Sequence, residues 1–164
     1  MIPHSLKTDG QDTADVVARF LFEQGGRLAD IHGATPRELE ATYAFAYNLY
    51  NQARWREALR VFGFLVQEDH LDRRFHLGRA GCLKMLKRPE DALRAYGIAH
   101  LLDVEDPTVG LHVAECLMAL GRRGDAKVAL EAVIAIAEDQ PPFADLVRRA
   151  NAVIQLIEPA QESA

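Results

Sequence analysis

Serine, cysteine and aromatic residues are scarce in this chain, and each scarcity excludes a class of protein. Only two of the 164 residues are cysteines, too few for a disulfide framework, and aromatics make up 7%. The only serines, Ser5 and Ser163, stand near the two ends of the chain, away from any histidine in a regular element. A catalytic serine is therefore not expected.

Positive charge and long apolar runs are also in short supply. The chain has 19 Lys and Arg against 24 Asp and Glu, a net charge of −5, and no basic patch is visible along the sequence. We therefore expect no nucleic-acid partner and no attraction to anionic lipid. The first ten residues contain no signal-peptide core, and no stretch approaches the ~18 apolar residues of a membrane span. These features predict a cytoplasmic protein that does not insert into membranes.

What the chain does contain is an internal repeat of 34 residues. Its apolar residues are mostly Ala, Leu and Val, which favours an all-α fold. Small and large apolar residues recur every 34 positions in five columns: Ala46, Ala80, Ala114; Leu49, Leu83, Leu117; Ala58, Ala92, Ala126; Phe62, Tyr96, Leu130; Leu65, Ala99, Val133. This period is typical of tetratricopeptide repeats, in which stacked helix pairs form a short right-handed solenoid.

The repeat register divides the chain into segments. We predict a tetratricopeptide-repeat domain at 35–158, with repeats at 39–72, 73–106 and 107–140 and a capping helix at 142–157. Thr35-Pro36-Arg37-Glu38 and Asp106-Pro107 read as helix starts, Pro89 as the start of a second helix, and Gly121 as a left-handed helix end. Residues 1–34 hold a tail and a helix from Asp12 to Gln24 that ends at Gly25-Gly26, and 159–164 are predicted to be a disordered tail.

No residue pattern indicates catalysis or metal binding. Cys82 and Cys116 are 34 residues apart in equivalent helices, which favours buried packing over a disulfide. No histidine pair has the i, i+4 spacing of a zinc site, and we interpret His70 and His76 as surface or interface residues beside a turn. Acidic pairs such as Glu68-Asp69 are assigned to helix capping. We expect no enzyme activity, no metal and no cofactor.

The first helix of each tetratricopeptide repeat lines the concave face of the solenoid. In the first repeat this face holds Tyr43, Tyr47 and Tyr50, while Ala46 and Leu49, together with Phe45, are expected to face the packing partner. Such aromatic residues suit recognition of an extended peptide. The predicted groove residues are Tyr43, Tyr47, Tyr50, Asn51, Arg74, Leu77, Gly81, Lys84, Met85, Leu111 and Glu115, and the same register also offers Glu40, Thr108, Met118 and Ala119.

Several motifs resemble one family, the class II chaperones of type III secretion (the LcrH/SycD group). The resemblance covers about residues 20–137. The motifs are Gly25-Gly26, the run Tyr43-Ala-Phe-Ala-Tyr-Asn-Leu-Tyr50, the run Asp69-His70-Leu-Asp72-Arg-Arg-Phe75-His-Leu-Gly78, the run Leu102-Asp-Val-Glu-Asp-Pro107 and the run His112-Val-Ala-Glu-Cys-Leu117.

The resemblance implies a cytoplasmic chaperone whose groove holds a short Pro- and Leu-containing segment of a translocator protein. The apolar face of the first helix, Val16, Val17, Phe20 and Leu21, must either fold back on the first repeat as a cap or pair with a second chain. The resemblance implies a homodimer formed through the N-terminal region, with this face as the candidate interface.

Two other readings belong to different classes. A co-chaperone repeat that binds a C-terminal carboxylate needs Lys and Asn where this chain has Tyr43 and Tyr47, which argues against that reading. A tetratricopeptide scaffold or regulatory adaptor in a secretion or assembly complex remains as the alternative.

Overall fold

The computed structural model describes residues 10–157, so the first nine residues of the predicted N-terminal segment and the tail predicted at 159–164 lie outside the described residues. Within 10–157 every regular element is a helix. The elements are α1 (Gly10–Phe22), α2 (Leu28–His32), α3 (Pro36–Asn51), α4 (Trp55–Glu68), α5 (Arg73–Met85), α6 (Pro89–Leu102), α7 (Thr108–Ala119), α8 (Arg123–Ala137), the 3₁₀ turn η1 (Pro141–Phe143) and α9 (Ala144–Ile157).

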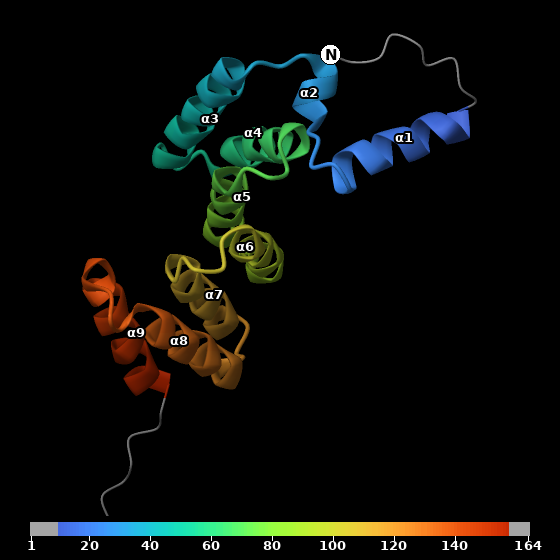
Figure 1. Cartoon of the computed structure of the whole chain (residues 1–164). Helices are drawn as coiled ribbons and strands as arrows, with labels where there is room; N and C mark the ends of the chain where they lie inside the picture. Colours follow the sequence, from blue (N-terminus) through green and yellow to red (C-terminus); the bar gives the residue numbers. More distant parts are fainter. Residues whose placement is uncertain (1–9, 158–164) are drawn as a thin grey trace, which may run out of the picture.

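Helices α3 to α8 form three successive pairs, and α9 packs against α8 at the end of the array (Figure 1). The pairs α5–α6 and α7–α8 lie within the predicted segments 73–106 and 107–140, whereas α3 begins at Pro36, three residues before the predicted segment 39–72. The predicted all-α solenoid with a helix at each end is therefore confirmed. Among the described residues, no helix is long and apolar enough to cross a membrane.

The five periodic columns supply most of the buried apolar core. All fifteen of their residues are buried, from Ala46 to Val133. The alanines at 58, 92 and 126 are fully buried, so a small side chain lies at the closest helix–helix approach in every pair. Phe45 was expected beside this stripe, but its side chain is 56% exposed and faces away from the core.

The turn within each helix pair has one repeated backbone geometry. Ala53, Lys87 and Gly121, each 34 residues apart, have positive φ angles of 58°, 58° and 74°. In each turn the residue after this position donates its backbone N–H to a carbonyl five residues earlier, as Arg88 does to Leu83 at 3.0 Å. These are Schellman turns, in which a left-handed residue ends the first helix. The prediction for Gly121 is confirmed.

Helix starts follow the sequence signals with one difference. Thr35 and Glu38 form the expected capping box at the start of α3, and α6 begins at Pro89. At α7 the residue next to the helix is Pro107, and Asp106 accepts a hydrogen bond from the Thr108 backbone N–H at 2.8 Å.

The N-terminal region differs most from expectation. Helix α1 begins and ends two residues earlier than predicted, and it extends away from the helix pairs (Figure 1). A short helix, α2, was not predicted. It docks on α4 through an ion pair, Arg27 Nη1 to Asp69 Oδ2 at 2.9 Å, and a polar contact, His32 Nδ1 to Glu68 Oε1 at 3.3 Å.

Two sequence assignments are wrong here for the same physical reason, which is burial by neighbouring segments. Glu68 and Asp69 do not cap a helix start; they are only 5% and 8% exposed at the end of α4, where they bind α2. His76 was assigned to the surface or to an interface, and the surface assignment is wrong: it is 3% exposed, and its Nε2 lies 2.9 Å from the His70 carbonyl oxygen. Burial lowers the pKa of His76.

Candidate binding groove

A cavity of about 290 Å³ opens along the first helices α3, α5 and α7. Seven of the predicted groove residues line it: Tyr43, Tyr47, Tyr50, Arg74, Leu77, Gly81 and Lys84. Thr108, at a concave position of α7, lines it as well. The first helices converge here because the periodic alanines and leucines of each helix face the opposite way, into the core.

One side of this groove is a tyrosine wall formed by Tyr43, Tyr47 and Tyr50. The Tyr43 ring stacks on Tyr47 with 6.3 Å between centroids, and it also contacts the buried rings of Phe62 (6.0 Å) and Phe75 (5.8 Å). Burial raises the pKa of Tyr43. Tyr47 is 52% exposed. The tyrosine wall therefore combines a ring held against the core, Tyr43, with a ring that solvent can reach, Tyr47.

Arg74 covers the anchored end of the wall. Its guanidinium carbon lies 4.9 Å from the centre of the Tyr43 ring, within cation–π range. Asp72 and Glu40 hold it there, at 2.8 Å and 3.1 Å, and these hydrogen bonds raise the pKa of Arg74. The cation is therefore fixed in place before any ligand binds.

The opposite side holds a polar cluster. Lys84 Nζ lies 2.6 Å from Glu115 Oε2 and 3.1 Å from His112 Nδ1, and the His112 ring stacks on Tyr96 with 5.4 Å between centroids. Hydrogen bonds from His112 and Lys84 lower the pKa of Glu115 to about 2. Glu115 does not line the cavity; it positions Lys84, which does.

Other predicted residues lie elsewhere. Leu111 is wrong as a groove residue, because it is 3% exposed in the core cluster that contains Leu130 of α8 and Ala150 of α9. Asn51 and Met85 are exposed but outside the cavity lining. An added β-carbon on Gly81 would lie 3.4 Å from Tyr50 Cε2, so that glycine faces a tyrosine ring.

The groove also contains residues that sequence reasoning did not place there: Phe62, Gly78, Tyr96, Val109 and His112. Phe62 and Tyr96 come from the second helices and were predicted only as core; each ring is large enough to pack in the core and reach the groove floor. The 34-residue spacing of Phe62 and Tyr96 indicated their place in the core. No comparable signal distinguished His112.

The groove combines apolar walls with two cations that are already paired. Its walls are aromatic and aliphatic, and its cations already have carboxylate partners. Among the described residues, no group of His, Cys, Asp and Glu could hold a metal ion. Cys82 and Cys116 are buried and unbonded, and burial raises the pKa of the Cys82 thiol to about 12, so its thiolate is not available.

No protein-family model matches the chain. Low calcium response locus protein H of Yersinia pseudotuberculosis is 29% identical, and the match covers 94% of this chain and 92% of that protein. PcrH of Pseudomonas aeruginosa, solved with the chaperone binding region of PopD, superposes with a TM-score of 0.72 at 32% identity and covers 75% of this chain and 92% of that chain.

The type III secretion chaperone SycD of Yersinia enterocolitica, solved with a peptide of the translocator YopD, also superposes with a TM-score of 0.72. It is 28% identical, and the match covers 75% of this chain and 94% of that chain. SycD has been solved as an alternative dimer too. The helix pairs, the motifs and these likenesses agree, and the chain belongs to the class II chaperones of type III secretion, the LcrH/SycD family.

Proposed function

We propose that this chain is a cytoplasmic chaperone of a type III secretion system. It binds an extended segment of a hydrophobic translocator protein in the groove and keeps that protein soluble and competent for secretion. The observation that carries the proposal is the tyrosine-walled groove along the first helices of a fold shared with PcrH and SycD, which were solved with segments of PopD and YopD.

The shape and chemistry of the groove support a short peptide containing Pro and Leu. Tyrosine rings offer large apolar contact area with little loss of side-chain freedom, and they are enriched among residues that dominate binding energy. Proline and leucine side chains of an extended segment can pack on these rings. Carboxylates hold Arg74 and Lys84 at the polar ends of the groove. The N–H groups that these cations have left can donate hydrogen bonds to backbone carbonyl groups of the peptide.

The experiment is calorimetry with a Pro-x-Leu-x-x-Pro-type peptide and the full chain. Replacement Tyr47→Ala should weaken binding by about 1–3 kcal/mol, as expected for an aromatic residue at the centre of an interface. Phe45→Ala is the matched control: Phe45 lies on the same helix and is 56% exposed, but outside the cavity. Equal affinity of both variants and the unmodified chain would contradict the proposal.

We extend the proposal to a homodimer through α1. Val16 is 45% exposed, and Val17, Phe20 and Leu21 are partly exposed, on a helix that extends away from the helix pairs. Apolar side chains on such a helix are costly to leave in water, which favours burial against a second copy.

A further inference from the structure

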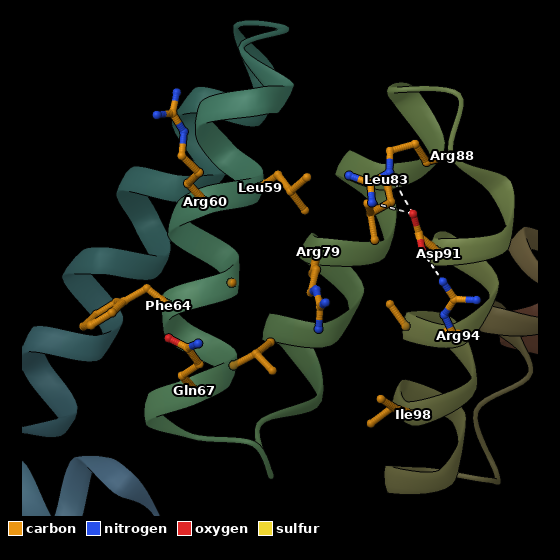
Figure 2. A pocket seen from close by; sticks show the side chains of 13 residues that line it. Leu59, Arg60, Phe64, Gln67, Arg79, Leu83, Arg88, Asp91, Arg94 and Ile98 are labelled. Atoms are coloured by element: carbon orange, nitrogen blue, oxygen red, sulfur yellow. Dashed lines mark hydrogen bonds and ion pairs between the residues drawn. The ribbon is translucent and has the colours of Figure 1, made fainter.

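A second and larger cavity, of about 610 Å³, lies between α4 and α6 with α5 as its floor. Figure 2 shows Leu59 on α4, Arg79 on α5 and Ile98 on α6 directed toward the same space. This arginine cavity shares no lining residue with the tyrosine-walled groove.

Four arginines line the arginine cavity, Arg60, Arg79, Arg88 and Arg94, against one carboxylate, Asp91. The concentration of positive charge is unexpected in a chain of net charge −5. The four arginines are scattered in the sequence and meet only in the fold, because they come from α4, α5, α6 and the turn before α6.

The arginines differ in how their charge is balanced. Asp91 Oδ2 accepts a hydrogen bond from Arg88 Nε at 2.7 Å, and Asp91 also pairs with Arg94. Among the described residues, neither Arg60 nor Arg79 forms an ion pair with a carboxylate, although Glu57 is near enough to Arg60 to interact with it electrostatically. Both guanidinium groups therefore have donors left for an external anion.

The remaining lining is largely apolar, and it includes Leu59, Val66, Ala95 and Ile98. Ile98 is 41% exposed, and Phe64, also in the lining, is 49% exposed. A phosphate backbone would leave these apolar side chains without a partner. A polypeptide that carries carboxylates beside apolar side chains matches both parts of the lining.

The arginine cavity belongs to one place in the solenoid. Residues 34 positions after Arg79 and Arg94 are Val113 and Val128, so the next space between second helices lacks both charges. Arg60 and Arg88, by contrast, are matched by Arg94 and Arg122 at the same interval, so Arg79 is the lining arginine without an ion pair that the repeat does not carry forward.

We propose that the arginine cavity is a second docking site, which binds an acidic amphipathic segment of a partner protein. Its carboxylates pair with Arg60 and Arg79, and its apolar side chains pack on Leu59 and Ile98. Because the two sites share no residue, a chaperone with a peptide in its groove can bind this partner at the same time.

The test uses a fluorescent amphipathic peptide with Glu on one helical face and Leu on the other, titrated with the full chain. We expect saturable binding that weakens as salt increases, and a loss of about tenfold or more for the double variant Arg60→Glu, Arg79→Glu. The control Arg37→Glu, Arg123→Glu makes the same change of charge at two exposed positions outside the cavity and should retain affinity.

Further measurements distinguish the arginine cavity from the tyrosine-walled groove, and a protein ligand from a nucleic acid. Tyr47→Ala should leave acidic-peptide binding unchanged, and the Ile98 methyl resonance should shift on titration. The proposal is overturned if the unmodified chain does not bind the acidic peptide, if the two double variants bind it equally, or if a single-stranded oligonucleotide binds there and the peptide does not.

Discussion

The ring of Phe62 on α4 occupies the space that a side chain on Gly78 of α5 would need: an added β-carbon there would lie 2.2 Å from Phe62 Cε1. Phe62 is 1% exposed and meets the Tyr43 ring edge-on, at 69° between planes. Because Gly78 has no side chain, the Phe62 ring can lie against α5, where it supports Tyr43 of the tyrosine wall.

This contact makes Gly78→Ala destabilising. The new methyl group would displace a fully buried ring, and overpacking of this kind costs about 1–3 kcal/mol. Urea unfolding measures it. Gly97→Ala is the control, because a β-carbon at Gly97 meets nothing within 4 Å and alanine improves helix propensity by roughly 0.5–1 kcal/mol. If both variants gain stability, the Phe62–Gly78 contact is not tight.

Tyr43 and Tyr47 should respond differently to replacement by alanine. Tyr43→Ala removes contacts with Phe62 and Phe75, so both unfolding free energy and peptide affinity should fall. Tyr47 is half exposed and contacts Tyr43, so Tyr47→Ala should lower affinity with little change in stability. Calorimetry and thermal melting of the same samples separate the two effects; equal losses of stability would contradict the distinction.

Glu115 should contribute a pH-dependent part of stability. Its pKa in the folded chain is about 2, against an ordinary 4.5, so the ionised form stabilises the fold. This contribution is complete above about pH 4.5 and is lost as pH falls toward 2. Glu115→Gln should cost on the order of 1 kcal/mol at pH 6, a small value because the side chain is 38% exposed and screened by solvent.

Unfolding by urea at several pH values tests this. The difference in unfolding free energy between Glu115→Gln and the unmodified chain should shrink steadily below pH 4.5. A difference that stays constant down to pH 2.5 would rule out the ionic contribution.

The repeated left-handed turns predict opposite effects at equivalent positions. Lys87→Gly should stabilise the chain by roughly 0.5–1 kcal/mol, because glycine adopts positive φ without the strain of a β-carbon. Gly121→Ala should cost about 1 kcal/mol by the reverse argument, since nothing lies within 4 Å to add packing. Thermal melting decides the signs, and identical signs would contradict the backbone explanation.

The proposed dimer can be tested at Val16. Its exposed side chain, if buried against a second copy, contributes roughly 1.5–3 kcal/mol, so Val16→Glu should shift the chain toward monomer in sedimentation experiments. Ala18→Glu adds the same charge at an exposed position on another side of α1. Val16 is a better choice than Phe20, whose ring packs against Gly26 within its own chain. A chain that stays monomeric at about 100 μM would contradict the dimer.

The periodic part of the fold was predictable because equivalent residues occupy the same packing position in each repeat. Ala58, Ala92 and Ala126 could be placed in the core from their spacing, and the left-handed turn at Gly121 from its residue type. Half of the groove followed from the same register, since Tyr43, Tyr47 and Tyr50 share one helical stripe.

The non-periodic part was not predictable in this way. The contacts of Arg27 with Asp69 and of His32 with Glu68 join segments about 40 positions apart, and neither helical spacing nor capping signals indicate them. Leu111 was misplaced because a concave position in one repeat can become core in another, where neighbouring helices cover it. Phe62 and Tyr96 belong both to the core and to the groove lining. A sequence pattern that divides residues into buried and exposed places each of them in the core alone.

Each helix of α3–α9 packs chiefly on the helices next to it along the chain. Most tertiary contacts therefore close short loops, which lowers contact order and favours fast folding. Such an array has no single central core, so its two ends can fray while the middle pair remains intact. Backbone amides of α5 and α6, which have a helix pair on either side, should exchange their hydrogens more slowly than those of α9, so the part of the solenoid that both binding sites share is also its most persistent.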